Sequence, residues 1–254
     1  MSGLPSWPEG YDKLVLDSTD STLSEAQRRF AGGATRPLWI LALTQTAARG
    51  RRGRPWAMPP GNFAATLILP TSDRPDQLAL RSFIASLALH DACTAATGRT
   101  DGFTLKWPND VLLNGGKLAG ILLESLSAGG RTAAASIGIG VNLAAAPGAA
   151  EVEERALRPV ALTEAGARPT PEDFLDLLAP AFARYEQQFL TYGFAPIRTE
   201  WLNVYWVWVI LFLLLRKPRI NLMKKKPSAL KRRSRKTNLT SYFLSTHQTS
   251  VHSF

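Results

Sequence analysis

The chain has 254 residues, of which 45% are hydrophobic and 20% charged, and its formal net charge is +10. These proportions are typical of a globular protein, and one cysteine, Cys93, excludes a fold held together by internal disulfides. Residues 201–254 contain eleven Lys and Arg and no Asp or Glu, which leaves 19 basic and 20 acidic residues in positions 1–200. Because residues 1–200 are nearly neutral, the overall charge does not support nucleic-acid binding by this part of the chain.

The first 200 residues predict strands mixed with helices. In chain order we expect strand 13–16, helix 24–30, strands 39–43 and 63–69, helix 77–97, strands 118–124 and 134–141, and helix 171–189. Gly98 is suited to end the helix over 77–97, and Thr170 is suited to cap the start of the last helix. The elements do not alternate strictly, so they indicate an α/β or α+β domain with a mixed sheet flanked by helices.

Residues 201–254 differ from the body, since they contain no Gly and one Ala. Val204 to Leu215 is an unbroken apolar run, but it is shorter than the roughly 20 residues that a membrane-spanning helix needs. An interfacial or aggregation-prone segment is therefore expected, and membrane contact is not. We expect the following basic stretch to be a solvated tail, with a nucleic-acid patch as the alternative. A shifted reading frame or a fusion junction near Trp201 is one hypothesis for the change.

The sequence ARGRRGRPW at residues 48–56 lies between two predicted strands. Gly50 and Gly53 allow a backbone to approach a ligand closely, and the guanidinium groups of Arg49, Arg51 and Arg54 suit phosphate and carboxylate oxygens. The stretch lacks the ending of a P-loop. It predicts a loop that binds an anionic ligand, with a basic surface loop as the alternative.

A second stretch, KWPND, covers residues 106–110. Because Pro108 favours an extended residue before it, Lys106, Asn109 and Asp110 are expected on a turn between strands. Asn109 and Asp110 are candidates to anchor neighbouring backbone or to help hold a magnesium ion. The sequence contains no cluster of His, Cys or carboxylate residues at metal-ligand spacing, so no metal site formed by the protein alone is predicted.

Two apolar strands follow this turn. A tight connection is expected at Gly115 and Gly116, and Lys117 then begins an almost wholly apolar strand, which favours a side chain directed into a site. Gly120 is small enough for a close approach. In SIGIGVNLAAAP, residues 136–147, glycines alternate with isoleucines, which indicates that backbone or ligand packs against one face. Asn142 ends that strand, where binding groups often lie.

Together these stretches resemble the biotin protein ligases, also called biotin–[acetyl-CoA-carboxylase] ligases. In that family a loop of the pattern GRGRRGR-x-W closes over biotin and the adenylate, and residues 49–54 and Trp56 match it, with Ala48 in place of the first Gly. The resemblance covers residues 12–200 and implies a class II aminoacyl-tRNA-synthetase-like catalytic domain. Residues 201–254 then form an atypical tail where the family has a small β-barrel.

The resemblance also implies the functional residues. Lys117, Arg51 and Arg49 would be catalytic, because they offset the repulsion between an anionic carboxylate and an anionic phosphate. The residues that would bind biotin, ATP or the adenylate are Ser21, Thr22, Gln45, Arg49, Gly50, Arg51, Arg54, Trp56, Lys106, Asn109, Asp110, Lys117, Gly120 and Asn142. The family motif Asp-Ser-Thr-Asn is placed at 20–23 rather than 17–20, because it leads directly into the helix, so Leu23 replaces Asn.

The implied reaction has two steps. The carboxylate of biotin attacks the α-phosphate of ATP, bound with Mg²⁺, and a lysine of a biotin carboxyl carrier protein then takes the biotinyl group. The implied partner is the carrier of acetyl-CoA carboxylase or of a related carboxylase, and the expected location is cytoplasmic, since the first 30 residues do not resemble a signal peptide. Homodimerisation stays open.

Three alternative functions differ from this interpretation. A lipoate ligase or octanoyl transferase would have the same fold, and an inactive ligase with a disrupted C-terminus would have the same motifs. A DNA-binding repressor is not expected, because about a dozen residues precede the first strand, too few for a winged helix.

Overall fold

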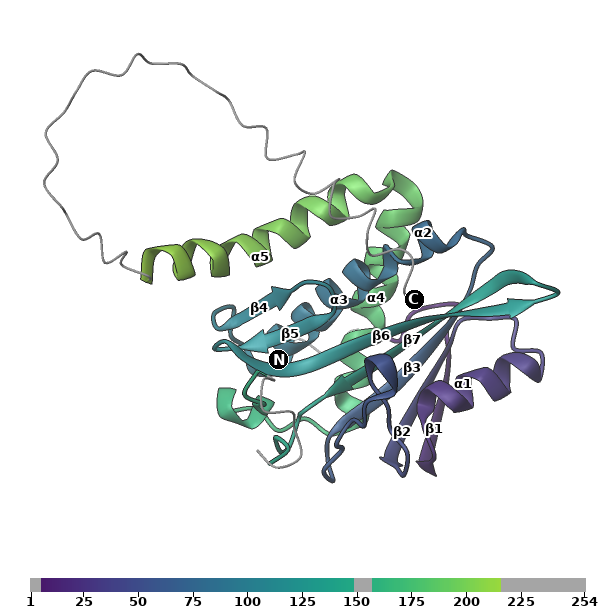
Figure 1. The fold of residues 1–254 in the computed structure, drawn as a ribbon, viewed down its shortest axis with the longest axis horizontal. Helices are drawn as coiled ribbons and strands as arrows, with labels where there is room; N and C mark the ends of the chain where they lie inside the picture. Colours follow the sequence, from purple (N-terminus) through teal and green to yellow (C-terminus); the bar gives the residue numbers. More distant parts are fainter. Residues whose placement is uncertain (1–5, 149–156, 216–254) are drawn as a thin grey trace, which may run out of the picture. The chain divides into compact units, whose positions relative to one another are not determined.

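Residues 6–148 and 157–215 are described by a computed structural model, and for residues 206–215 it describes the helix backbone alone. Seven strands in these ranges form one sheet of order β1-β2-β3-β7-β6-β5-β4. The strands are β1 (Asp12–Thr19), β2 (Leu38–Gln45), β3 (Phe63–Pro70), β4 (Phe103–Lys106), β5 (Asp110–Leu113), β6 (Gly116–Ala128) and β7 (Arg131–Val141). The helices are α1 (Thr22–Ala31), α2 (Pro75–Leu78), α3 (Arg81–Thr97), α4 (Pro171–Tyr192) and α5 (Phe194–Leu215). This mixed sheet flanked by helices confirms the predicted fold class (Figure 1).

One parallel pair gives the sheet its mixed character. β1 and β2 are parallel and are joined by α1, whereas every other neighbouring pair is antiparallel. A parallel pair needs a crossover connection, and α1 supplies it. The end of β1 and the end of β2 therefore lie side by side, with Thr19 opposite Gln45. This arrangement brings the start of α1 next to the loop that follows β2.

The two faces of the sheet are covered differently. Because side chains alternate along a strand, Trp39 and Leu67 point to one face, where they join the main core with helices α3 and α4. Ile40 and Ile68 point to the other face and pack with Ala26 of α1. That second cluster is small, so α1 covers only part of its face. The remaining part of this face is where the candidate site lies.

The helices expected over 24–30, 77–97 and 171–189 are found close to their predicted positions, as α1, α2 with α3, and α4. Gly98 ends α3 in the left-handed conformation with φ 67°, and the Thr170 hydroxyl accepts a hydrogen bond from the backbone N–H of Asp173 at 3.1 Å. One helix was expected over 77–97, whereas the structure has α2 and α3, separated at Ala79 and Leu80. Both residues between them keep helical dihedrals, so the two helices are nearly continuous.

The region between α3 and Lys117 differs from the expectation in two ways. Residues 103–106 and 110–113 form strands β4 and β5, neither of which was predicted as an element. The tight connection to β6 uses Asn114 and Gly115, with φ of 49° and 79°, rather than Gly115 and Gly116. An Asn-Gly pair is the favoured centre of a two-residue hairpin that needs positive φ at both positions. Gly116 is the first residue of β6 and lies against Val160, so that a Cβ there would come within 2.3 Å of Val160 Cγ1.

Helix α5 continues through position 201, where the composition changes. Trp201 is buried, its indole N–H donates to Ser86 Oγ at 3.0 Å, and its ring packs edge-on against Phe83. This helix was not predicted from the sequence, and its Val204–Leu215 part was expected as an interfacial or aggregation-prone segment. Within the described ranges, every helix is too short or too polar to cross a membrane.

A buried ion-pair network ties α3 to α4. The Arg81 guanidinium contacts the carboxylate of Asp73 and donates to Glu186 Oε1 at 2.9 Å, and its side chain is 2% exposed. Burial raises the pKa of Glu186, and the charge of Arg81 opposes that shift. The second oxygen of Glu186 is buried without a hydrogen-bond partner among the described residues. The charge of Arg81 is therefore what makes the ionised Glu186 tolerable at this position.

Candidate functional site

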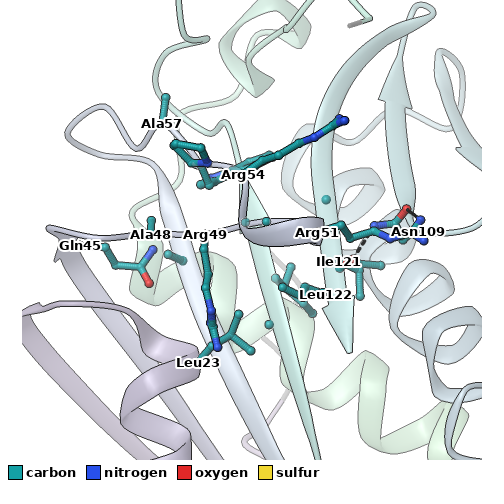
Figure 2. Close-up of a pocket in the computed structure, with 18 of the residues that line it drawn as sticks. Leu23, Gln45, Ala48, Arg49, Arg51, Arg54, Ala57, Asn109, Ile121 and Leu122 are labelled. Atoms are coloured by element: carbon teal, nitrogen blue, oxygen red, sulfur yellow. Dashed lines mark hydrogen bonds between the residues drawn. The ribbon is translucent and has the colours of Figure 1, made fainter. Parts of the chain in front are cut away.

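A cavity of about 560 Å³ opens on the face of the sheet that α1 covers only in part (Figure 2). Gly120 on β6 and Gly138 and Gly140 on β7 lie on its floor, where the absence of side chains leaves room above the strands. The rim comes from the start of α1, the loop 48–57, β5 and the segment 157–159. The predicted site residues that line it are Ser21, Thr22, Gln45, Arg49, Gly50, Arg51, Arg54, Trp56, Asn109, Asp110, Lys117, Gly120 and Asn142.

The wall at α1 is polar but uncharged. The backbone N–H of Thr22 donates to Gln45 Oε1 at 2.7 Å, which fixes the helix start to the end of β2. The Thr22 hydroxyl accepts from Thr66 Oγ1 at 2.8 Å. A hydroxyl has one proton to donate, so Thr22 can still donate to a ligand. Ser21 is buried at the N-cap position and lines the cavity beside it.

Leu23 completes this wall. Its side chain is 4% exposed and packs over Gly138, where an added Cβ would come within 2.9 Å of Leu23 Cδ2. Residues 21–23 therefore line the cavity, whereas Asp20 does not, and Asp17 and Ser18 are exposed on β1. Leu23 has no hydrogen-bonding group on its side chain, so the apolar contact with Gly138 is what it adds to the site.

The arginine-rich segment forms a small closed loop. Arg49 pairs with Pro55 as an isolated bridge, and the Trp56 N–H donates to the carbonyl of Ala48 at 3.0 Å. Between them lies the 3₁₀ turn η1 (Arg51–Gly53), in which Arg52 adopts a left-handed φ of 58°. The base of the loop is therefore held by backbone hydrogen bonds, and its tip carries exposed arginines.

The arginines reach different parts of the cavity. Figure 2 shows the Arg49 side chain running toward Leu23 and Arg51 pointing the other way, toward Asn109. Arg49 Nη2 donates to Glu124 Oε2 at 3.1 Å, and Arg51 Nη1 lies 3.5 Å from Asn109 Oδ1. The loop thus distributes positive charge along the cavity instead of concentrating it at one point.

Trp56 lies flat against the glycine floor. A Cβ on Gly140 would come within 2.8 Å of its indole, and one on Gly120 within 3.4 Å. At position 140, therefore, only glycine leaves room for the ring. The ammonium group of Lys117 lies 5.6 Å from the centre of the same ring, a distance at which a cation and an aromatic face attract.

Lys117 is held from two sides. Its Nζ lies 2.9 Å from Asp110 Oδ1, and its backbone pairs with the segment 157–161, donating to Arg158 and accepting from Val160. Its side chain is 31% exposed. The sequence predicted that this lysine points into a site, and the structure places it on the cavity. An anionic ligand there would meet an ammonium group already oriented by a carboxylate.

Two of the predicted residues, Asn109 and Asn142, hold neighbouring backbone in place, and a third, Lys106, lies outside the cavity lining. Asn109 donates from Nδ2 to the carbonyl of Ile121 at 2.6 Å, which anchors the β4–β5 turn to β6. Asn142 is 2% exposed and donates to the carbonyl of Val160 at 3.1 Å. Lys106 ends β4 with an exposed side chain and is not one of the residues that line the cavity, so its role stays a prediction.

Carboxylates are scarce around the cavity. Among the described residues no group of three or more His, Cys, Asp or Glu side chains is arranged to hold a metal ion. Asp110 lines the cavity and is paired with Lys117. A magnesium ion commonly binds one or two carboxylates together with substrate phosphates, and the donors present here fit an ion that arrives with a nucleotide.

Several residues at the site were not singled out from the sequence. Gly138 and Gly140 were visible only as part of a strand in which glycine alternates with isoleucine, and that alternation was the signal for an open floor. Leu122 and Pro159 belong to no motif that would indicate a binding role, and they line the cavity because the fold brings their segments to it. Glu124 ends the strand predicted over 118–124, but nothing in the sequence pairs it with Arg49, 75 positions away.

Comparison with known proteins agrees with this geometry. The profile of the biotin/lipoate A/B protein ligase family matches residues 15–142. The biotin–[acetyl-CoA-carboxylase] ligase of Paracoccus denitrificans is 54% identical over 189 residues, which cover 74% of this chain and 78% of that protein. The bifunctional ligase/repressor BirA of Bacillus subtilis is 31% identical over 189 residues, which cover 74% of this chain and 56% of that protein. The chain therefore spans most of the first relative and little over half of the second.

Solved structures show the same fold. A biotin protein ligase from Aquifex aeolicus in complex with biotin and ATP aligns with a TM-score of 0.63 at 24% identity, covering 76% of this chain and 78% of that one. A biotin protein ligase from Leishmania major in complex with biotin aligns with a TM-score of 0.61 at 20% identity, covering 88% of each chain. At these identities the likeness concerns the fold alone.

Proposed function

Because the chain belongs to the biotin/lipoate A/B protein ligase family, we propose that it is a biotin–[acetyl-CoA-carboxylase] ligase that activates biotin with ATP and transfers it to a carrier protein. The observation that carries the proposal is the cavity, in which an uncharged polar wall at α1 faces a loop of arginines and Lys117. A ligand with a neutral polar head and a carboxylate end fits this division. The 54% identity with the Paracoccus ligase supports the same substrate class.

The first reaction joins two anions. A carboxylate oxygen of biotin attacks the α-phosphorus of ATP, the bond from that phosphorus to the bridging oxygen breaks, and pyrophosphate leaves. Arg49, Arg51 and Lys117 offset the repulsion between the reactants, and their effect is largest where negative charge accumulates in the transition state. Ser21, Thr22 and Gln45 orient the head of biotin. Mg²⁺ bound to the nucleotide would add Lewis-acid stabilisation of the phosphates, and Asp110, a carboxylate that lines the cavity, would help to hold it.

The second reaction transfers the acyl group. The amine of a carrier lysine attacks the carbonyl carbon of biotinyl-5′-AMP, AMP leaves, and the proton released by the amine passes to solvent. The partner is a biotin carboxyl carrier protein of acetyl-CoA carboxylase or of a related carboxylase. A cytoplasmic location would give the enzyme access to this partner and agrees with the single buried cysteine.

The overall reaction is tested by incubating the purified chain with biotin, MgATP and the carrier domain of an acetyl-CoA carboxylase. Biotin detected on the carrier, and no product when lipoate replaces biotin, is the expected result. Labelling with lipoate and not biotin would favour the lipoate branch of the family. A carrier whose target lysine is replaced by arginine serves as the control for non-specific labelling.

Replacing Arg51 by alanine is expected to raise the rate at which biotinyl-5′-AMP escapes from the site by about tenfold, the effect of losing one charge-assisted contact. Retention is measured by trapping released adenylate after a single turnover. Arg99→Ala is the matched control, because Arg99 is an exposed arginine paired with Asp101 away from the cavity. Equal retention by both variants would remove Arg51 from the mechanism.

A further inference from the structure

Glu124 lies beside the site without lining the cavity. It is on β6, and residues two apart on a strand share a face, so its side chain is on the same face of the sheet as the Leu122 side chain and above the same row of positions as Gly120. Its Oε2 accepts the hydrogen bond from Arg49 Nη2 at 3.1 Å, and the two side chains are 30% and 28% exposed. The carboxylate therefore reaches the arginine loop from the sheet.

A carboxylate at this position is unexpected. The cavity is lined by arginines and Lys117, as expected of a site that binds an anion. A carboxylate next to such a site repels anionic ligands unless another group neutralises the carboxylate. Arg49 neutralises Glu124, but only one of its terminal nitrogens is used. Arg49 Nη1 is buried and has no hydrogen-bond partner in residues 6–148 and 157–205.

We propose that Glu124 is a positioning residue for the reaction: it fixes Arg49 through Nη2, so that the guanidinium group is held at the cavity, where its charge acts on the carboxylate of biotin and the α-phosphate. This inference rests on the proposed function. Holding a long side chain before the ligand arrives lowers the conformational entropy that binding must remove. Because the backbone of Arg49 is also held, by its bridge to Pro55, both ends of the residue are fixed.

The contrast with Arg51 supports this role. Arg51 is exposed and lies 3.5 Å from a neutral amide oxygen of Asn109, a weaker restraint than an ion pair. Of these two arginines, Arg49 is the one oriented by an opposite charge. Glu124 thus acts on the reactants only through Arg49. The loss of Glu124 should therefore have no further kinetic effect once Arg49 has been replaced.

The experiment compares Glu124→Gln, Arg49→Gln and the double variant with the wild type. Glutamine keeps the size of Glu124 and an acceptor oxygen but removes the charge. We expect Glu124→Gln to raise the KM for biotin, or the dissociation rate of biotinyl-5′-AMP, by about tenfold, the effect of losing one charge-assisted bond in a partly exposed position. The midpoint of thermal unfolding is expected to stay unchanged.

The double variant separates positioning from a general structural role. If Glu124 acts through Arg49, the double variant is no worse than Arg49→Gln alone, whereas additive losses would overturn the proposal. Asp176→Asn is the matched control, since Asp176 makes a long-range ion pair with Lys13 at 2.6 Å with similar exposure and does not line the cavity. A wild type that does not form the adenylate would contradict the proposed function. An active wild type with an indistinguishable Glu124→Gln would contradict this inference alone.

Discussion

Replacing Lys117 by glutamine is expected to lower the rate of adenylate formation on the order of 10²- to 10³-fold. The side chain lines the cavity, lies 2.9 Å from Asp110 and faces the ring of Trp56, so its ammonium group is oriented before a substrate binds. A preoriented charge stabilises the transition state without reorganisation, and a neutral amide of similar length does not replace it. The measurement is the single-turnover rate of biotinyl-5′-AMP formation at saturating biotin and ATP.

Lys13→Gln is the matched control for this variant. Lys13 is also paired with a carboxylate, Asp176, and its side chain is 29% exposed, against 31% for Lys117. It lies on β1 outside the cavity-lining set, so its replacement is expected to leave the rate within about twofold of the wild type. Equal, small effects of the two substitutions would show that Lys117 makes no specific contribution to the transition state.

The largest expected loss of stability follows from Arg81→Met. Arg81 is 2% exposed and is the positive partner of both Asp73 and Glu186. Methionine fills a similar volume but leaves Glu186 as a buried charge without a counter-ion, and breaking a buried pair in this way costs about 3–5 kcal/mol. Chemical denaturation at pH 7 gives the free energy of unfolding of the variant and the wild type.

The double variant Arg81→Met, Glu186→Leu is the control, because it removes both buried charges. It is expected to recover most of the lost stability, since an apolar replacement of a whole pair is often neutral. A double variant as unstable as the single one would mean that the loss arises from packing. That outcome would contradict the electrostatic explanation.

The effect of Arg81→Met should depend on pH. Burial raises the pKa of Glu186 above its ordinary value of 4.5, and Arg81 opposes the increase, so the folded variant takes up a proton even more readily. A carboxyl with a raised folded-state pKa contributes stability below its unfolded pKa and loses it as the pH rises through the folded-state value. The difference in unfolding free energy between variant and wild type is therefore expected to be smaller at pH 5 than at pH 7.

Patterned segments were predicted well from the sequence. Apolar periodicity indicated the strand over 39–43, and a capping side chain, Thr170, indicated the start of α4. A glycine suited to the left-handed conformation, Gly98, indicated the end of α3. The motifs singled out the arginine loop and Lys117, which line the cavity, and their roles stay predictions. Because β1 and β2 are parallel and adjacent, the start of α1 lies next to the arginine loop, which the sequence alone did not establish.

The missed features depend on contacts between distant residues. β4 and β5 have four residues each, too short to show a period, and they form because β6 provides an edge to pair with. Helix α5 was missed because its apolar run has no helical period, and Trp201 is buried through contacts with distant residues, among them Phe83 and Ser86. The pair of Arg49 and Glu124 joins positions 75 apart, so no local pattern indicates it.

Of residues 201–254, the structure describes those up to Leu215, which belong to helix α5. The compositional boundary at 201 does not coincide with the end of a structural element. Residues 12–200 as the catalytic domain, followed by an atypical tail, stay a prediction. A chain ended after residue 215 that retains adenylation would show that the remaining residues are not needed for the first step.

The most direct test of the central claim is biotin-dependent exchange of labelled pyrophosphate into ATP by the purified full-length chain. We expect exchange with biotin and none with lipoate, because the first step is reversible adenylation of biotin, whose neutral head is proposed to lie at the wall at α1 and whose carboxylate is proposed to lie at Lys117 and the arginine loop. Exchange with lipoate alone, or no exchange by a chain that circular dichroism shows to be folded, would contradict the assignment of this cavity to biotin activation.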